Sequence, residues 1–360
     1  MKLFSCQCCQ QALYFENIAC ESCHHSVGYL PGLATLTALE PTGTGRWHPV
    51  EEQVQHAELV YCANHAYDAC NWLTTPDRSG RPAICFACRF NRTIPNLDNP
   101  RNLERWRKIE VAKHRLFYTL LRLKLPIRSR WEDPHNGLAF DFLDDAADGS
   151  APIMTGHNNG LITLAIREAD DAERERMRVE MGEYYRTLLG HFRHEIGHYY
   201  WNVLVRDAGR LESCRAVFGD DQQDYQEALQ NHYNNPPPED WRERHVSMYA
   251  TSHPWEDFAE TWAHYLHIVS TLETAWAYGV TIHPVLPDAS PLSTNGPGND
   301  PYLTSTFDEI MEAWVPLTSA VNSLNRSMGL SDFYPFVLTS GVREKLAFIH
   351  SLSRETQALG

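Results

Sequence analysis

The sequence lacks an apolar run of about 18 residues, the shortest that predicts a membrane-spanning helix, and its mean hydropathy is −0.43. Its first residues, Met1 to Cys6, also lack the apolar stretch that a secretory signal requires. Positive charge is scarce, because 31 Lys and Arg stand against 46 Asp and Glu and the formal net charge is −15. These features exclude a membrane-spanning protein and argue against broad binding to nucleic acid or to anionic membrane surfaces.

Cysteine is almost absent from most of the chain, since only Cys214 lies beyond residue 88. The other nine of the ten cysteines are crowded into the N-terminal segment. Without an export signal, such crowding indicates metal ligands rather than a disulfide framework. We therefore expect a metal-binding N-terminal segment and a reducing, cytoplasmic location.

The length of 360 residues suits two domains, and 43% hydrophobic residues is typical of globular proteins. The stretch Thr93–Pro100 contains two prolines and two asparagines, which disfavour both helix and strand. We predict a linker there, between a small domain of residues 1–95 and a larger domain of residues 96–360.

The larger segment shows both helical and strand patterns. A 3.6-residue apolar stripe predicts a helix over residues 103–124, and Pro126 would stop it. Residues 138–143 and 161–166 are predicted strands, and a polar helical stretch runs from about residue 170 toward 191. The predicted class is α+β. The apolar stripe of the helix predicted over residues 103–124 consists of Trp106, Ile109, Leu116, Phe117 and Leu120.

Two pairs of cysteines begin the chain, Cys6-x2-Cys9 and Cys20-x2-Cys23. A Cys-x-x-Cys turn directs two sulfurs at one tetrahedral Zn²⁺, and a second such turn closes the site. Four thiolates leave no open position, so this pattern predicts a structural zinc site. Cys8 is left over, although it could replace Cys9 if the turn is distorted.

A second cluster is less regular. Cys85-x2-Cys88 is a third such turn, and Cys62 and Cys70 are its obvious partners. His65, in Cys62-x2-His65, competes with Cys70 for the fourth ligand position. We favour Cys70, since all-thiolate sites are common in small zinc domains. The cysteines of the two sites could also be interleaved, because sequence alone does not assign the pairing. Two structural zinc ions would supply folding free energy to a short segment with few apolar residues.

The pattern His-Glu-x-x-His occurs once, at His194, Glu195 and His198. On a helix, residues i and i+4 share a face, so both histidines can bind one Zn²⁺. Glu195 can then act as general base on the zinc-bound water. The metzincin version of this motif requires Gly and His at the positions of Trp201 and Leu204, and it is excluded.

A third ligand is needed so that the fourth position stays open for water. Glu256, Glu260 and His264 fall at i, i+4 and i+8 on one face of a predicted helix that also carries Phe258 and Trp262. Either Glu256 is the ligand, or Glu260 is the ligand with His264 as its partner.

This part of the sequence resembles gluzincin zinc metallopeptidases, and its Glu-x-Phe-Ala-Glu string resembles the third-ligand helix of the anthrax lethal factor catalytic domain. In that family a tyrosine seven residues before the ligand glutamate helps to stabilise the oxyanion. Tyr249 lies seven residues before Glu256. The resemblance therefore implies Glu256 as zinc ligand and Tyr249 as electrophilic helper, with Glu260 orienting a ligating histidine.

The whole chain is similar to a bacterial family of zinc-binding metallopeptidases with an N-terminal zinc ribbon. The resemblance implies a small ribbon domain followed by a mainly helical, zincin-like domain with a small sheet. It is carried by six segments: the cysteine pairs of residues 6–23, Cys70 to Leu73, Cys85 to Pro95, His194 to His198, Glu256 to Glu260, and Asp332 to Leu338.

The expected function is zinc-dependent peptide hydrolysis with one catalytic and two structural Zn²⁺, in which the ribbon recognises substrate or a protein partner. By analogy with other zincins, the predicted strand at residues 161–166 would be an edge strand that pairs with an extended peptide, although an ordinary core strand is an equally good interpretation. The alternative function is a ribbon-based binding or regulatory protein whose helix site is vestigial or stores zinc.

Overall fold

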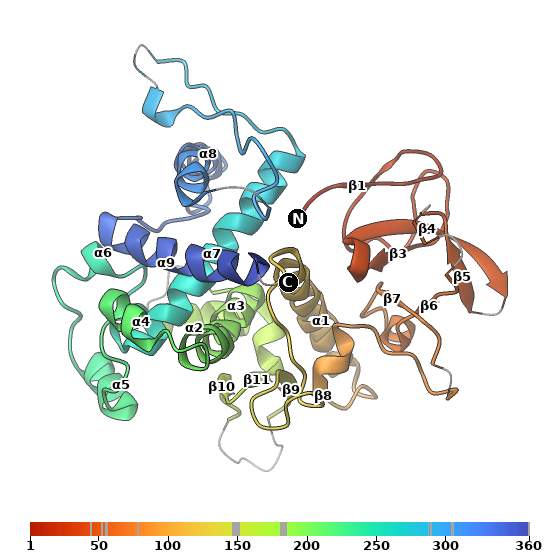
Figure 1. Ribbon diagram of the computed structural model, residues 1–360, viewed down its shortest axis with the longest axis horizontal. Helices are drawn as coiled ribbons and strands as arrows, with labels where there is room; N and C mark the ends of the chain where they lie inside the picture. The colour runs from red at the N-terminus through yellow and green to blue at the C-terminus, as the bar shows by residue number, and fades with distance from the viewer. Residues whose placement is uncertain are drawn as a thin grey trace. The chain divides into compact units, whose positions relative to one another are not determined.

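The computed structural model describes the chain except residues 44, 52, 55–56, 78, 146–151, 181–185, 287, 289, 304–305 and 359–360. The chain forms two compact units (Figure 1). The N-terminal unit comprises Lys2–Arg122 and Pro126–Glu175, and the C-terminal unit comprises Arg176–Gly360 with Leu123–Leu125 and Met1. The predicted boundary at residues 95 and 96 therefore falls inside the N-terminal unit.

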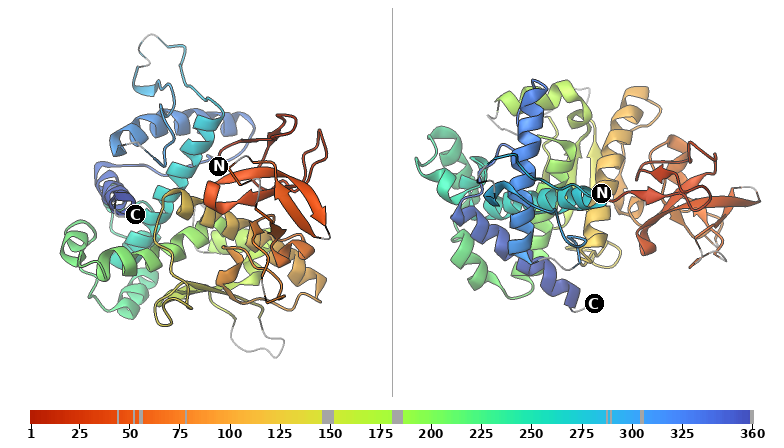
Figure 2. Two further views of the ribbon diagram at one scale, coloured as in Figure 1. Left: turned by 45° about the vertical axis from the view of Figure 1, so that its right-hand side comes forward. Right: turned by 90° about the horizontal axis from the view of Figure 1, so that it is seen from above.

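Short antiparallel strands build the first part of the N-terminal unit, and three of them form a twisted sheet (Figure 2). One two-stranded pair precedes this sheet in sequence and another follows it, and the cysteines of both clusters lie outside the strands. The strands are β1 (Phe4–Ser5) with β2 (Ala12–Leu13), β3 (Val27–Leu30), β4 (Thr35–Gly43) and β5 (Arg46–Pro49), and β6 (Val60–Tyr61) with β7 (Leu73–Thr74). Short 3-10 turns occupy Pro31–Leu33, Ala63–Tyr67 and Cys88–Phe90.

A four-stranded sheet completes the N-terminal unit in the order β10-β11-β9-β8. Its strands are β8 (Asn91–Thr93), β9 (Ala139–Leu143), β10 (Gly156–Asn158) and β11 (Leu161–Ala165). β11 pairs with β9 in parallel and with β10 in antiparallel fashion, so both of its edges are filled. The expectation that residues 161–166 form a substrate-binding edge strand was wrong, because β10 caps that side of the sheet.

Helix α1 (Pro100–Arg122) corresponds to the helix predicted over residues 103–124. It begins three residues earlier and ends two residues earlier than predicted, and its apolar stripe is buried. The aromatic ring of Tyr118 packs edge-on against Phe15, at 5.2 Å between centroids. Phe15 in turn contacts Tyr29, and Tyr29 contacts Trp72, at 4.9 and 4.8 Å. These contacts explain why the compact unit is not cut at residue 95: α1 and the cysteine-rich segment share one aromatic core.

The predicted polar helix from about residue 170 to 191 is two helices. A 3-10 turn (Ile166–Ala169) precedes α2 (Asp171–Glu180), and α3 (Leu188–Tyr200) begins at the N-cap Thr187, whose side chain accepts from the Gly190 N–H. Residues 181–185 lie outside the described part of the chain. The N-cap fixes where α3 starts, and therefore where its histidines point.

The C-terminal unit is helical, with α7 buried along most of its length among α3, α4, α8 and α9. The sequence of elements after α3 is a π-helical turn (Trp201–Arg206), α4 (Leu211–Phe218), α5 (Tyr225–Asn234), α6 (Trp241–Arg244), a 3-10 turn (Tyr249–Thr251), α7 (Pro254–Ala277), a 3-10 turn (Ser290–Leu292), α8 (Phe307–Ser327) and α9 (Ser340–Ala358). The α+β class is confirmed, with strands in small sheets and helices in the majority. Among the described residues, no helix is long and apolar enough to cross a membrane.

The approach of α3 to α7 depends on Gly197. A Cβ atom at this position would lie 2.9 Å from the Cα of Ala259 and 3.2 Å from the Cβ of Trp262. Any larger residue would push the two helices apart, because backbone atoms cannot move aside as a side chain can. The glycine of the His-Glu-Ile-Gly-His string is thus what allows side chains of α3 and α7 to share one site.

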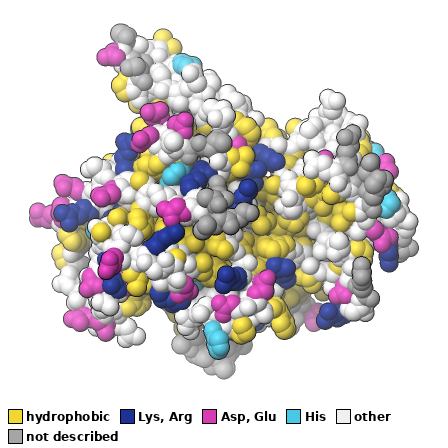
Figure 3. Space-filling view, viewed as in Figure 1, with side chains coloured by type: hydrophobic (Ala, Val, Ile, Leu, Met, Phe, Trp, Pro, Cys, Tyr) yellow, Lys and Arg dark blue, Asp and Glu magenta, His cyan; other side chains and the backbone are white. Residues whose placement is uncertain are grey.

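Charged side chains of both signs are interspersed over the face drawn in Figure 3. Among the described residues visible in that view, Lys and Arg do not gather into one continuous basic patch.

Candidate metal centres

The first cysteine cluster brings together Cys6, Cys9, Cys20 and Cys23, whose sulfur atoms lie within 4.8 Å of one another. The Sγ atoms of Cys6 and Cys23 are 3.6 Å apart, and those of Cys9 and Cys20 are 3.5 Å apart. Sulfurs bound to one tetrahedral zinc are about 3.8 Å apart, since each Zn–S bond is about 2.3 Å. Cys8 is exposed and stays outside this group.

The second cysteine cluster consists of Cys62, Cys70, Cys85 and Cys88, all of which are buried. The Sγ atoms of Cys70 and Cys85 are 3.7 Å apart. Three backbone N–H groups donate to cluster sulfurs at 3.4 Å, from Trp72 to Cys70, from Cys85 to Cys62, and from Cys88 to Cys85. Such donors favour the thiolate form, which is the form that binds zinc.

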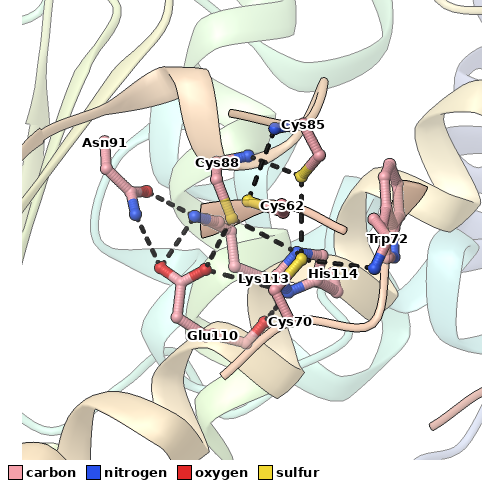
Figure 4. Close-up of polar contacts among 9 residues, drawn as sticks. All are labelled: Cys62, Cys70, Trp72, Cys85, Cys88, Asn91, Glu110, Lys113 and His114. Atoms are coloured by element: carbon pink, nitrogen blue, oxygen red, sulfur yellow. Dashed lines mark hydrogen bonds and ion pairs between the residues drawn. The ribbon is translucent and has the colours of Figure 1, made fainter. Parts of the chain in front are cut away.

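His65, the rival fourth ligand, does not enter the second cluster. Its Nδ1 lies 3.0 Å from the backbone oxygen of Cys70, and its ring stacks on Tyr61 at 4.0 Å. A different histidine reaches the sulfurs: His114 of α1 comes within 3.3 Å of the Cys70 Sγ (Figure 4). Sequence reasoning missed it because nothing in the local spacing links residue 114 to a cysteine pair.

The helix site brings His194 and His198 of α3 to Glu256 of α7. The Glu256 Oε2 lies 3.0 Å from the His194 Nε2 and 3.4 Å from the His198 Nε2. All three side chains are largely buried, and the His198 ring lies against Trp255 at 3.7 Å between ring centroids. Two imidazole nitrogens and one carboxylate oxygen thus converge on one point from two helices.

Glu260 lies behind His194 rather than beside the three converging atoms. Its Oε1 is 2.8 Å from the His194 Nδ1, and its Oε2 accepts from the Ser247 hydroxyl at 2.5 Å. Although burial alone raises the pKa of Glu260, its hydrogen bond and charge interaction with His194 lower that pKa to about 2. An ionised Glu260 holds the proton on Nδ1 and so turns the Nε2 lone pair toward Glu256 and His198.

The rival assignment, with Glu260 and His264 as ligands, does not match this arrangement. The Nδ1 of His264 lies 2.8 Å from the hydroxyl of Tyr334, and His264 is outside the group of converging donors. Both residues share a helix face with Glu256, as expected, but only Glu256 has its carboxylate between the two histidines of α3.

Two tyrosines complete the helix site, and the sequence indicated only one of them. Tyr225, at the start of α5, donates to the Glu256 Oε1 at 2.6 Å, and Tyr249 is close enough to Tyr225 to influence its hydroxyl. The Tyr249 ring lies 5.8 Å from the His194 ring. Burial raises the pKa of both phenols above the ordinary value, so both hydroxyls stay protonated as donors.

Glu195 follows His194 on α3 and is 9% exposed. Burial raises its pKa, while its electrostatic interactions with His194 and His198 act in the opposite direction. Its charge also acts on both Tyr225 and Tyr249. The carboxyl group of Glu195 is therefore near enough to the two phenols and to the two histidines to influence them electrostatically.

This donor set fits zinc. Nitrogen and oxygen ligands at about 2.0–2.2 Å from one tetrahedral ion lie about 3.3–3.6 Å apart, close to the 3.0 and 3.4 Å separations of the helix site. Three protein ligands leave a fourth position for water or substrate, as in catalytic sites, whereas each four-cysteine cluster is closed.

Comparisons with known proteins agree with this picture. Residues 102–352 match the sequence model of a family described as "putative zinc-binding metallo-peptidase", and residues 3–99 match a zinc-ribbon domain. Uncharacterized proteins of Mycobacterium bovis and of two Mycobacterium tuberculosis strains are 42% identical over 356 residues, which cover 99% of this chain and 96% of each relative. No solved structure matches the chain.

Proposed function

Because the chain belongs to this zinc-binding metallopeptidase family, we propose that it hydrolyses peptide bonds at the helix site. The observation that supports the proposal is the convergence of His194, His198 and Glu256 beside the buried carboxyl of Glu195. His194, His198 and Glu256 would hold the catalytic zinc. A bound zinc ion would polarise the scissile carbonyl and make an attacking water more acidic.

In this proposal each neighbouring side chain has a separate task. Glu195 takes the proton of the attacking water and later passes it to the leaving amine. Tyr249 donates to the oxyanion that develops on the carbonyl oxygen. Tyr225 holds Glu256 through its 2.6 Å hydrogen bond, and Glu260 fixes the ring of His194.

The two cysteine clusters have structural roles in this proposal. Each supplies four thiolates, so neither leaves a coordination position for a substrate. The catalytic part therefore needs one zinc and the ribbon needs two. The ribbon recruits protein substrates or partners, and thiolate ligation by eight cysteines suits a reducing, cytoplasmic compartment.

A mixed peptide library tests the proposed function. The zinc-loaded protein is expected to cleave a subset of the peptides. A library of many sequences is used because no particular cleavage sequence is assumed. A chelator should stop the cleavage and added zinc should restore it, with products identified by mass spectrometry. Absence of any zinc-dependent cleavage by the fully loaded protein would contradict hydrolysis at this site.

The two tyrosines should respond differently to the same change. Tyr249→Phe is expected to lower kcat by about 10²–10³-fold with unchanged zinc affinity, because it removes a single oxyanion donor. Tyr225→Phe should instead weaken zinc binding by about 10–100-fold, because it removes the hydrogen bond that orients Glu256. Steady-state kinetics and zinc titrations of both variants would separate the roles, and equal effects on zinc affinity would reject the assignment of Tyr249.

A further inference from the structure

The loop between α4 and α5, residues 219–224, brings Tyr225 to the helix site. Residues 222–224 are exposed, whereas the hydroxyl of Tyr225 donates to the Glu256 Oε1 at 2.6 Å. Loops are more mobile than the elements that they connect. The position of Tyr225 at the helix site therefore depends on the contacts that hold the 219–224 loop.

The first part of the 219–224 loop is held at two points. Gly219 has a φ of +100°, which glycine adopts without strain. A Cβ atom there would lie 3.5 Å from the Cγ of Pro254, so the loop begins beside the first turn of α7. Asp221 accepts from the Arg215 guanidinium at 2.6 Å, and this interaction lowers the pKa of Asp221. Both contacts come before the part of the loop that adjoins Tyr225.

His253 contacts the last part of the loop from the start of α7. It is 4% exposed and is the N-cap residue of that helix. Its Nδ1 accepts from the Trp255 backbone N–H at 3.0 Å. Because an N–H group can only donate, Nδ1 bears the lone pair, and in the neutral ring Nε2 carries the proton. The Nε2 lies 3.2 Å from the backbone oxygen of Gln223, to which it therefore donates.

The ring of His253 thus connects α7 to the segment that carries Tyr225. Gln223 lies two residues before Tyr225, and Glu256 lies three residues after His253. The Tyr225 ring also packs edge-on against the His253 ring at 5.4 Å between centroids, and against the Trp255 ring at 5.7 Å. Both partners of the hydrogen bond from Tyr225 to Glu256 are therefore held next to one buried side chain.

The two carboxylate oxygens of Glu256 have different partners. The Oε1 accepts from Tyr225, whereas the Oε2 lies 3.0 Å from the His194 Nε2 and 3.4 Å from the His198 Nε2. The bond from Tyr225 therefore fixes which oxygen faces the two histidines. A shift of Tyr225 would free the carboxylate to rotate, and a ligand that loses its orienting hydrogen bond binds metal more weakly.

We propose that His253 is a positioning residue of the helix site: it holds the 219–224 loop so that Tyr225 keeps Glu256 oriented for zinc. His253 is not among the converging donors and acts on the metal through Tyr225. Its N-cap role is separate, because its two ring nitrogens have different partners. The inference rests on the part of the proposed function that assigns zinc to the helix site, and it does not require that the site hydrolyses peptides.

Two substitutions separate the two hydrogen bonds of the His253 ring. His253→Asn keeps an acceptor for the N-cap, but its amide is one bond too short to donate to the Gln223 carbonyl. His253→Gln places an amide N–H where the Nε2 lies and gives up the N-cap. The zinc affinity of the helix site should fall about 10-fold in His253→Asn. It should stay near the unaltered value in His253→Gln, whose thermal midpoint should fall instead.

The affinity is measured by competition with a zinc chelator, on protein whose cysteine clusters remain loaded. His283→Asn is the matched control, because His283 is exposed and should tolerate the change without effect on zinc affinity. Unaltered zinc affinity in His253→Asn, or an equal loss in His253→Asn and His253→Gln, would overturn the proposal.

A double-variant cycle tests whether His253 acts through Tyr225. The zinc affinity of His253→Asn/Tyr225→Phe should lie within about 2-fold of that of Tyr225→Phe, because the hydrogen bond that the loop positions is already lost. A general loosening of the structure would instead multiply the two losses, and that result would reject the role of His253.

These outcomes are distinct from a failure of the proposed function. Zinc bound at the helix site without cleavage of any peptide would contradict hydrolysis, and the affinities of the His253 variants would still decide the role of that residue. Hydrolysis with unaltered zinc affinity in His253→Asn would reject the positioning role alone. A helix site that binds no zinc in the unaltered protein would reject both.

Discussion

Glu195→Gln is expected to lower kcat/KM for peptide hydrolysis by about 10²–10⁴-fold, the usual contribution of a general base. Glutamine keeps the size of the side chain but cannot take a proton from water. The zinc content should stay unchanged, because Glu195 is not among the converging donors of the helix site. The measurement is kinetics on a peptide selected from the library, together with elemental analysis of the same preparation.

Glu212→Gln provides the control for this experiment. Glu212 is an exposed carboxylate in the first turn of α4 and should tolerate the change without effect on hydrolysis. If Glu195→Gln retained full activity, the hydrolysis would not arise at the helix site. The alternative of a ribbon-based binding protein with a non-catalytic metal site would then be favoured.

The double variant His194→Ala/His198→Ala should contain about two zinc ions per chain where the unaltered protein contains about three, because it loses two of three ligands of the helix site. Hydrolysis should disappear with that metal. The two cysteine clusters should keep theirs, since none of their ligands is altered. Elemental analysis after exposure to excess zinc and gel filtration is the appropriate measurement, because a site with an open position loses metal easily.

His191→Ala is the matched control for the double variant. His191 lies on the same helix, one turn before His194, but is outside the group of converging donors. Its removal should leave about three zinc ions and full activity. An unchanged zinc content in His194→Ala/His198→Ala, with circular dichroism showing an intact fold, would reject the helix site and with it the peptidase proposal.

Local spacing predicted the parts of the site that lie within one element. His194 and His198 are four residues apart, and a helix brings such residues to one face regardless of the rest of the fold. The cysteine pairs were predictable for the same reason, because each Cys-x-x-Cys turn brings its own two sulfur atoms together. The choice of Glu256 over Glu260 needed the resemblance to gluzincins, since both residues share one face of α7 and periodicity does not separate them.

Contacts between distant elements could not be predicted in this way. Tyr225 reaches Glu256 from a separate helix 31 residues earlier in the chain, and no pattern marks that approach. His114 lies 26 residues beyond Cys88, within a stripe that was correctly predicted as a helix. The sequence of α1 contains one local signal of a buried polar group, because the charged residues Glu110 and Lys113 lie beside its apolar positions. The filled edges of β11 depend on strand order, which alternation of apolar residues does not reveal.

Helix α1 has a consequence for how this chain can be divided or recombined. By sequence it belongs to the segment that matches the peptidase family, yet its Glu110, Lys113 and His114 complete the surroundings of cysteines in the ribbon segment. A truncation at residue 95 would expose the buried ion pair of Glu110 and Lys113 and separate it from the sulfurs. Exchange of ribbons between relatives would therefore have to carry α1 and the four-stranded sheet with the cysteines, rather than end at the linker.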